Sequence, residues 1–365
     1  MQETLAFLTL KAAKGLGPRK TKLLVQAFGS ASNVLAADTV ALSQVEGVGP
    51  NLIAAIQEAK SSSFPEKEWA RVENLKLSLL HLLDPGYPEA LRAIYDPPSL
   101  LYVKGSLPAY EGMQPRSLGV VGTRDASDFA LAFTEHLSEE LASRQVVINS
   151  GLALGVDTAA HKGALKTGAT VAVLGSGVDF IYPAQNRTLA GQIVERGGAI
   201  ISEYAIGSRP TATNFPGRNR IINGLSSGIV VVEAGEKSGA LITADYALQE
   251  GRQVCAVPGR PGDARASGCH KLLKQGALLV DNVTDILDEF NWHDQTNLTA
   301  QNLPDLNSFE SRVFEHIQKQ EPSLDQLVDN LNEPVSSLLP VLTMLELKGL
   351  IKMQANGRYM SLMHR

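Results

Sequence analysis

The sequence predicts an α/β fold whose centre is a doubly wound, mostly parallel sheet. Between residues 117 and 288, seven short apolar runs of strand length alternate with stretches of helical length. The runs are continuously apolar rather than alternating, which is typical of parallel strands buried on both faces. The expected strands are Leu118–Val121, Val146–Asn149, Thr170–Leu174, Ala199–Ser202, Ile229–Glu233, Val254–Val257 and Leu278–Asp281.

One helix is expected between each two consecutive strands. The resulting order of strand and helix indicates a Rossmann-like sheet, in which ligands bind beyond the carboxyl ends of the strands. We assign the connector and this Rossmann-like domain to residues 85–290. The expected helices are Phe129–Ser143, Thr158–Thr167, Asn186–Arg196, Asn219–Ser226, Ala240–Glu250 and Cys269–Gln275.

The first hundred residues read as short helices, and residues 1–84 are expected to form an N-terminal helical domain. Gly15-Leu16-Gly17-Pro18 and Gly47-Val48-Gly49-Pro50 each precede a helical stretch, 32 residues apart. This pattern resembles a helix-hairpin-helix or SAM-like domain, whose hairpin N–H groups can hold a DNA phosphate. The alternative is a pair of tight αα turns that need glycine only for positive φ.

The C-terminal part is expected to be a separate small domain. Residues 291–307 are polar, have no periodicity and read as a linker. Residues 308–365 fit three helices and a hairpin across Asn356-Gly357, which is the outline of a winged-helix-like domain. A protein–protein module with the same outline is the alternative. Residues 289–365 hold 6 basic and 10 acidic side chains, so a partner-binding role fits better than DNA reading.

Composition indicates a soluble protein, for which the cytoplasm is the expected location. Apolar residues make up 44% of the chain, no run is long enough to cross a bilayer, and we expect no membrane association. Cys255 and Cys269 form no metal-ligand spacing, so no metal is expected. The net charge of −5 argues weakly against a nucleic-acid ligand, but basic residues are bunched in residues 11–22 and 251–280.

The expected strands end repeatedly in glycine and hydroxyl residues. Such loops let a backbone approach a ligand closely, and the helix that follows directs its N-terminus at an anion. No P-loop, dinucleotide fingerprint or nucleophile elbow occurs, so we expect no nucleotide cofactor. The candidate anion-binding residues in these loops are Gly122, Thr123, Arg124, Ser150, Gly151, Gly175, Gly177, Ser238 and Gly239.

The stretch Phe215-Pro216-Gly217-Arg218-Asn219-Arg220 adds aromatic and basic candidates. Arginine forks match phosphate geometry, and a phenylalanine can stack on an unpaired base. The structural alternative is that an arginine pairs with Glu203 or Glu233 and that Phe215 lies in the core. The nearby His161 is expected to orient a loop rather than to catalyse.

Several motifs in order resemble the DNA-processing protein A (DprA/Smf) family. The resemblance is dense over residues 117–281 and lighter at both ends. The motifs are Gly122-Thr123-Arg124, Ser150-Gly151-x-Ala153-x-Gly155-x-Asp157-x-x-Ala160-His161, Tyr182-Pro183-x-x-Asn186, Ser202-Glu203-Tyr204, Phe215-Pro216-x-Arg218-Asn219-Arg220, Glu233-Ala234, Ser238-Gly239-x-Leu241-Ile242-Thr243-Ala244 and Val257-Pro258-Gly259.

The resemblance implies a protein that binds and protects incoming single-stranded DNA during natural transformation and helps to load RecA recombinase, as a homodimer and without catalysis. It places Arg124 on a backbone phosphate, with Phe215, Arg218 and Arg220 alongside. Where some relatives have a lysine shortly before the Phe-Pro pair, this chain has Ala212-Thr213-Asn214.

Two other functions remain open at this stage. A phosphoribohydrolase-like enzyme would split a base from a nucleoside monophosphate, and Asp157, Glu203 and Glu233 are the acid or base candidates. A purely structural adaptor would bind neither single strands nor nucleotides.

Overall fold

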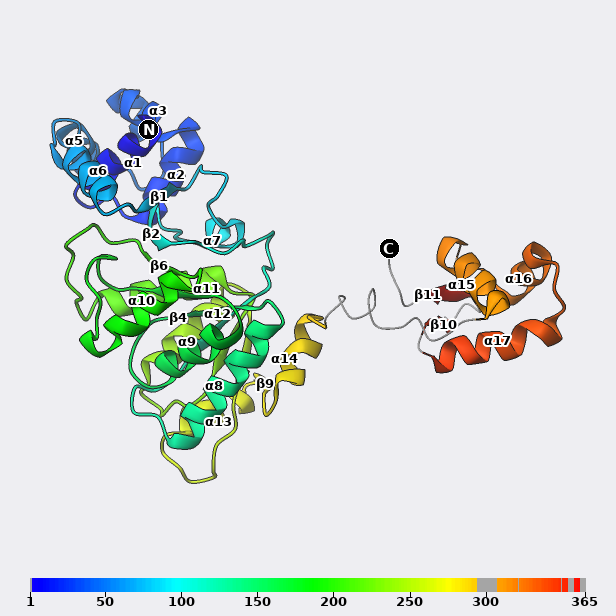
Figure 1. Cartoon of the computed structure of the whole chain (residues 1–365). Coiled ribbons are helices and arrows are strands. Elements are labelled where there is room, and N and C mark those ends of the chain that lie inside the picture. The colour runs from blue at the N-terminus through cyan, green and yellow to red at the C-terminus, as the bar shows by residue number, and fades with distance from the viewer. Residues whose placement is uncertain (1, 294–306, 321, 349, 354–357, 362–365) are drawn as a thin grey trace. The chain divides into compact units, whose positions relative to one another are not determined.

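The computed structural model describes residues 2–293, 307–320, 322–348, 350–353 and 358–361. The chain divides into two units, Met1–Trp292 and His293–Arg365 (Figure 1). The predicted linker at residues 291–307 lies mostly outside the described residues. None of the described helices has the length and apolar character needed to span a bilayer.

The first unit is built on a nine-stranded sheet with the order β1-β2-β6-β5-β4-β3-β7-β8-β9. The pairs from β6 to β9 are parallel, whereas β1 and β2 pair antiparallel at one edge. The predicted α/β class and doubly wound sheet are therefore confirmed. The strands are β1 Ser78–His81, β2 Leu100–Gly105, β3 Ser117–Val121, β4 Val147–Ser150, β5 Thr170–Val173, β6 Ala199–Ser202, β7 Gly228–Val231, β8 Gln253–Ala256 and β9 Leu278–Leu279.

The prediction of helices alone in the first hundred residues is wrong at β1 and β2. β1 has only four residues, and β2 follows Pro97-Pro98, so neither stood out from its turn-rich surroundings. β2 pairs with β6, and its first four residues are buried, which extends the sheet beyond the seven predicted strands. The antiparallel edge joins the N-terminal helices to the central sheet.

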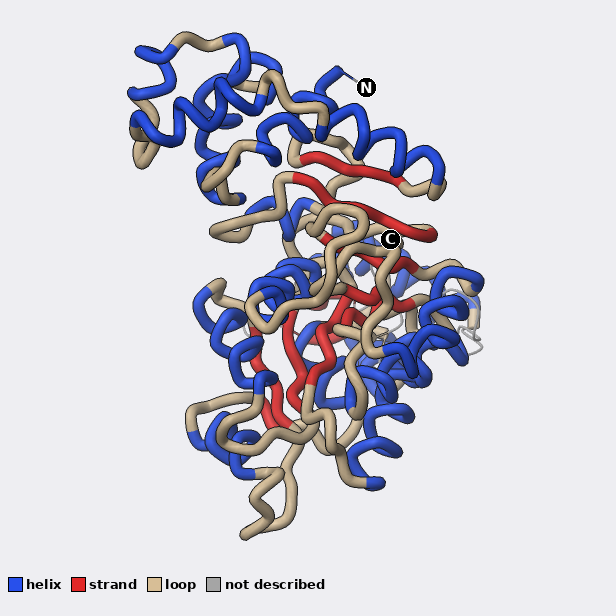
Figure 2. Tube along the Cα trace, turned by 90° about the vertical axis from the view of Figure 1, so that its left-hand side faces the viewer, coloured by secondary structure: helices blue, strands red, loops and turns tan. Residues whose placement is uncertain are grey.

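Helices cover both faces of the sheet (Figure 2). Successive residues of β7 divide between the two faces, because Ile229 and Val231 belong to one core cluster and Val230 and Val232 to the other. The helices of this region are α8 Asp128–Ser143, α9 Val156–Thr167, α10 Arg187–Glu195, α11 Asn214–Leu225, α12 Gly239–Gln249, α13 Ser267–Lys274 and α14 Val283–Phe290.

The order of the strands creates a switch point between β3 and β7. From β3 the chain adds β4, β5 and β6 on one side, and then it returns to add β7 and β8 on the other. The connections on the two sides run over opposite faces, which opens a crevice at the carboxyl ends of β3 and β7. β3 ends at this crevice with Val121, and β7 ends there just before Val232.

The N-terminal helices contain the predicted repeat. Gly17 and Gly49 precede α2 and α5, and each of these helices has a proline in its first turn. Gly15 and Gly47 have φ of 83° and 76°, which glycine adopts without strain. The helices are α1 Gln2–Ala12, α2 Pro18–Phe28, α3 Ala31–Ala36, α4 Thr39–Ser43, α5 Pro50–Ala59, α6 Phe64–Asn74 and α7 Glu89–Ala93.

The second unit has the three helices and the hairpin that the sequence predicts. They are α15 Ser308–Gln320, α16 Leu324–Leu331, α17 Val335–Leu347, β10 Ile351–Met353 and β11 Tyr359–Ser361. The unit has its own apolar core, in which Val313, Leu327 and Leu342 are buried. The Asn356-Gly357 turn lies outside the described residues.

Close packing of α8 against α9 gives a test of the fold. A Cβ at Gly163 of α9 would lie 2.0 Å from the Glu135 carbonyl oxygen of α8. We expect Gly163→Ala to lower the free energy of unfolding by about 1–3 kcal/mol, because neither backbone can yield freely. The urea unfolding midpoint measures this effect.

The matched control is Gly191→Ala on α10, where an added Cβ meets nothing within 4 Å. That substitution is expected to stabilise the chain by roughly 0.5–1 kcal/mol, because alanine loses less backbone entropy than glycine. Equal effects of the two substitutions would contradict the packing of α8 on α9.

Candidate nucleic-acid interface

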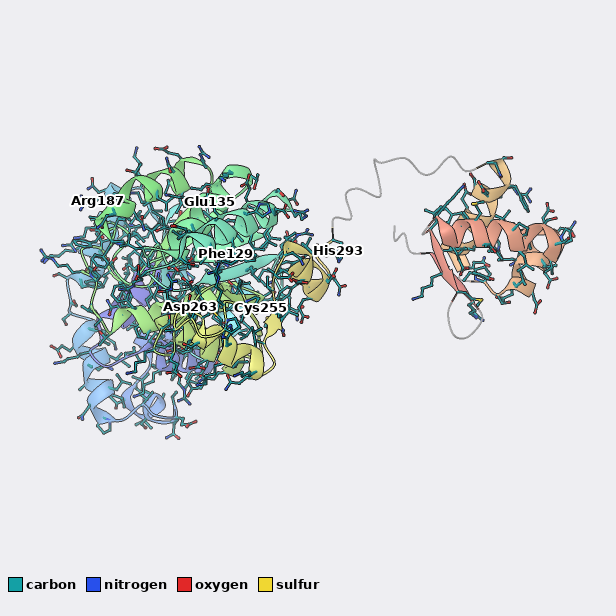
Figure 3. The ribbon with its side chains drawn as sticks, turned by 90° about the horizontal axis from the view of Figure 1, so that it is seen from below. Phe129, Glu135, Arg187, Cys255, Asp263 and His293 are labelled. Carbon is teal, nitrogen blue, oxygen red and sulfur yellow. The ribbon has the colours of Figure 1, made fainter. Side chains whose placement is uncertain are left out.

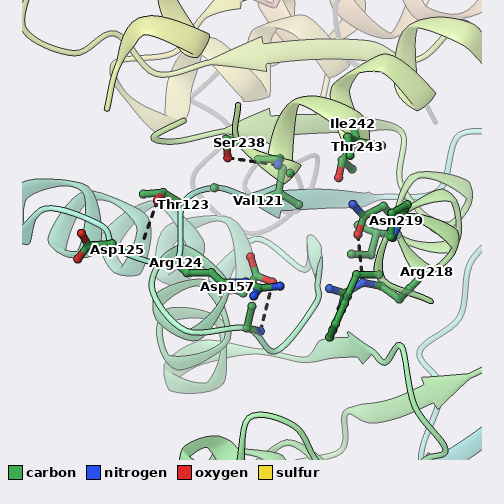
Figure 4. Close-up of a pocket in the computed structure, with 17 residues that line it drawn as sticks. Val121, Thr123, Arg124, Asp125, Asp157, Arg218, Asn219, Ser238, Ile242 and Thr243 are labelled. Atoms are coloured by element: carbon green, nitrogen blue, oxygen red, sulfur yellow. Dashed lines mark hydrogen bonds between the residues drawn. The ribbon is translucent and has the colours of Figure 1, made fainter. Parts of the chain in front are cut away.

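A pocket of about 370 Å³ opens at the switch point between β3 and β7. Its walls come from the β3–α8 loop, the first turn of α9, α11 and the start of α12 (Figure 4). The lining residues are Val121, Gly122, Thr123, Arg124, Asp125, Ala153, Asp157, Phe215, Pro216, Arg218, Asn219, Ile222, Ser238, Gly239, Ala240, Ile242 and Thr243. Eight of the thirteen residues predicted from the sequence are among them.

Gly122, Thr123 and Arg124 form the β3–α8 wall. The Thr123 backbone N–H donates to the Glu233 carbonyl at 2.7 Å, which fixes the loop to the end of β7. Gly122 has no room for a side chain, because a Cβ would lie 2.5 Å from Val156. The loop therefore presents Arg124, whose side chain is exposed, at the rim.

The Arg124 guanidinium lies over the Phe215 ring, 5.3 Å from its centroid. Within the described part of the chain, Arg124 has no ion pair and no hydrogen bond from its side chain. Phe215 is half-buried, and its ring lies 6.2 Å from that of Tyr182, which is 47% exposed. Cation and rings together form an accessible surface for a flat, anionic ligand.

Arg218 lines the inner wall of the pocket but is buried. Its guanidinium donates to the Gly151 carbonyl at 2.6 Å and to the Val173 carbonyl, and its Nε donates to Asn219 at 3.1 Å. Burial lowers the pKa of Arg218, against the opposing influence of Asp157. Arg218 thus ties α11 to the ends of β4 and β5.

Asp157 closes the pocket from α9. Its carboxylate accepts hydrogen bonds from the backbone N–H groups of Gly151 and Ala153 at 3.1 and 3.3 Å. Burial raises the pKa of Asp157, and the neighbouring Arg218 opposes that rise. These partners make the carboxylate an anchor for the β4–α9 loop.

Arg220 lies outside the pocket. Its Nε donates to Asp96 at 2.9 Å and its Nη2 donates to Glu203 at 2.8 Å. This is the pairing alternative that the sequence left open. The helix that carries Phe215, Arg218 and Arg220 begins at Asn214 rather than at the predicted Asn219. Arginines two residues apart on a helix are about 200° apart around its axis, so they face different surroundings.

Ser238 and Gly239 stand at the N-terminus of α12. The Ser238 hydroxyl accepts from the Ala240 backbone N–H at 3.3 Å, and a Cβ at Gly239 would meet nothing within 4 Å. The start of α12 therefore faces the pocket with open space beside it, and its dipole favours an anion there.

The remaining predicted residues support the pocket from outside its lining. The Ser150 hydroxyl donates to the Val120 carbonyl at 2.6 Å, and Gly151 leaves room for the Arg218 guanidinium. Gly175 faces Phe215, whereas Gly177 packs near Asp179 and the 205–207 backbone. Tyr182 and Thr243 were not predicted as contacts, although Tyr182 begins the Tyr-Pro motif and Thr243 lies in the motif that starts at Ser238.

The acid and base candidates are held by internal bonds. Glu203 accepts from Arg220, and both carboxylate oxygens of Glu233 accept from Ser127 at 2.8 Å. The buried His161 Nδ1 lies 2.7 Å from the Thr170 hydroxyl, which donates to the Ile148 carbonyl. His161 therefore donates from Nδ1 and holds α9 against β5. Among the described residues, no group of histidine, cysteine or carboxylate side chains could hold a metal ion.

The fold and the pocket define a Rossmann-like α/β protein with a separate winged-helix unit. The family model described as DNA recombination-mediator protein A matches residues 78–291, and the model of the DprA winged helix domain matches residues 298–357. The chain belongs to this DNA recombination-mediator protein A (DprA/Smf) family, as its motifs predicted.

Relatives and solved structures agree with this assignment. Protein Smf of Synechocystis is 35% identical over 97% of each chain, and Protein Smf of Escherichia coli is 40% identical over 74% of each. The structure of Streptococcus pneumoniae DprA has a TM-score of 0.67 and 34% identity, covering 80% of this chain and 99% of its own.

A Helicobacter pylori structure, described as showing the single-stranded DNA binding mode of DNA processing protein A, has a TM-score of 0.53 and 30% identity. It covers 59% of this chain and 96% of its own. This DNA-processing family therefore includes a structural neighbour that binds single strands.

Buried His161 predicts a pH dependence of stability. Burial is the main cause that lowers its pKa to about 3, with Arg218 adding to the effect. An unfolded histidine protonates near pH 6.5. Between these values the unfolded state binds more protons, so stability falls as the pH drops, by up to about 1.4 kcal/mol per pH unit.

Urea unfolding of the native chain and of His161→Gln between pH 6.5 and 4 tests this. The native chain should lose stability more steeply, because glutamine does not titrate. Parallel pH profiles would show that His161 is not held neutral in the folded state.

Proposed function

We propose that this chain binds single-stranded DNA at the pocket between β3 and β7. The observation that carries the proposal is the exposed Arg124 guanidinium over the Phe215 ring at the pocket rim. Phosphates attract such a cation, and an unpaired base can stack on such a ring. A duplex keeps its bases paired and stacked, so it cannot use the aromatic part of this surface.

Charge inside the pocket supports the same ligand. The start of α12 and the exposed Arg124 favour an anion in the pocket. Of the two acids in the lining, Asp157 is held by the Gly151 and Ala153 N–H groups and lies near Arg218, whereas Asp125 is exposed. The phosphate contacts we propose come from Thr123, Arg124, Ser238 and Gly239. Arg218 and Asn219 supply the charged and polar inner wall, and Arg220 contributes indirectly by holding α11.

We propose further that the bound strand is protected from nucleases and passed to RecA recombinase, with the chain acting as a cytoplasmic homodimer during natural transformation. The family's description as a recombination mediator and the motifs of residues 117–281 support this. The function needs no cofactor and no catalytic step, because it consists of holding and releasing a strand.

The first test is the single-strand affinity of Arg124→Ala, measured by fluorescence anisotropy across a salt series. We expect a loss of about tenfold, equivalent to about 1.4 kcal/mol, because one phosphate contact and its cation–π support are removed. The slope of log affinity against log salt should fall in magnitude by about 0.7, the value for one contact to a single strand.

The matched control is Arg144→Ala at the opposite end of α8, where the guanidinium binds Glu140. That end lies about 24 Å from the pocket end of the 16-residue helix, so binding should not change. No preference for single strands over duplex would overturn the proposal. Release of free base from nucleoside monophosphates, lost in Glu233→Gln, would then favour the enzymatic alternative.

The recombination step has its own test. RecA filament formation on a strand coated with single-strand binding protein should be faster with the native chain than without it. Arg124→Ala should reduce that gain and the nuclease protection together, while Arg144→Ala should keep both. Loading that is unaffected by Arg124→Ala would separate the RecA step from the proposed pocket.

A further inference from the structure

A second pocket, of about 630 Å³, lies on the other face of the same sheet edge. Its floor is formed by Val232 and Val257, which belong to the core cluster beneath α8, whereas Val121 of the first pocket belongs to the other cluster. The second pocket is lined by Ser127, Asp128, Phe129, Ala130, Val232, Glu233, Val257, Pro258, Gly259, Arg260, Pro261, Asp263, Arg265 and Ala266.

An exposed aromatic ring stands at this second pocket. Phe129, labelled in Figure 3, lies in the first turn of α8 and is 68% exposed. Its ring stacks on that of Phe133 at 6.2 Å between centroids. Pro258 and Pro261 form another apolar part of the wall. A large exposed ring beside an apolar floor gains apolar contact area when a flat ligand stacks on it.

Three carboxylates and two arginines line the second pocket. Asp263 pairs with Arg265 at 3.1 Å, the Glu233 carboxylate accepts two hydrogen bonds from Ser127, and Asp128 is exposed. Arg260 is exposed, and it has no ion-pair partner within the described part of the chain. The pocket therefore offers an exposed aromatic ring, Phe129, and an exposed guanidinium, Arg260.

The two pockets share one short segment of the chain. Gly122–Asp125 line the first pocket and Ser127–Ala130 line the second. We call this segment, Gly122–Ala130, the ridge; its Thr123 N–H donates to the Glu233 carbonyl, and its Arg124 is exposed. Arg124 of the first pocket and Phe129 of the second lie five residues apart on it.

We propose that the same single strand crosses this ridge and places a second base on Phe129, with a phosphate at Arg260. This inference rests on the proposed function of the first pocket. The occupant is a strand rather than an isolated nucleotide, because the two pockets share the ridge and each has an aromatic side chain and an exposed arginine in its lining.

The test compares short and long thymidine oligonucleotides. A 3-nucleotide strand is expected to occupy the first pocket alone, and a 12-nucleotide strand should reach both. Phe129→Ala should weaken binding of the long strand about tenfold and leave the short strand unchanged, since only the long strand would lose a stacked base. Arg260→Ala should reduce the salt dependence of the long strand only.

Leu248→Ala, at an exposed apolar residue near the other end of α12, is the matched control and should change neither affinity. If Arg124→Ala weakens both strands while Phe129→Ala weakens neither, the second pocket is not on the strand path and this inference fails alone. If the native chain binds neither strand, the proposed function itself fails. A change of oligomeric state in Phe129→Ala without a change of affinity would assign the surface to protein contacts and overturn the inference.

Discussion

The buried guanidinium of Arg218 sets the geometry on which the pocket depends. Removing such a charge from water costs several kcal/mol unless hydrogen bonds and an opposite charge offset that cost. Here the Gly151 and Val173 carbonyls accept from it, and Asp157 supplies the negative charge. A side chain at position 151 would displace this guanidinium, because a Cβ would lie 2.1 Å from it. One side chain thus joins α11, β4 and β5, so the pocket is formed before a ligand arrives.

The N-terminal helices hold the same region from the other side. Lys11 of α1 is half-buried and donates to the Glu203 carbonyl at 2.7 Å, while the Glu203 carboxylate accepts from Arg220 of α11. Glu68 of α6 accepts from the Ile206 backbone at 2.7 Å. Part of the basic stretch at residues 11–22 therefore packs against the central domain. This packing argues against a phosphate site at these residues and favours a structural role, in which the N-terminal helices support α11 and the 203–206 segment.

The sequence predicted the sheet well because buried parallel strands leave continuous apolar runs between helices. It missed β1 and β2, whose pairing depends on contacts with distant β6. The sequence also predicted the site as a set of loops at one edge, because the carboxyl ends of parallel strands meet there. The sequence could not assign Arg218 and Arg220 to different surroundings, because that assignment depends on the residue at which α11 begins. Pro216 concealed this start, although proline is tolerated in a first helical turn.

A chain with a net charge of −5 can still attract a polyanion at this edge. At physiological salt, exposed charges act over about 8 Å, so the local arrangement outweighs the total. Most acids near the pocket are held by internal partners: Glu203 and Asp96 by Arg220, Glu233 by Ser127, and Asp157 by the Gly151 and Ala153 N–H groups. Asp125 is exposed at the rim, as is Arg124, which has no ion-pair partner among the described residues. Internal partners of most of the acids, rather than an excess of basic residues, thus leave Arg124 and the start of α12 available to a polyanion.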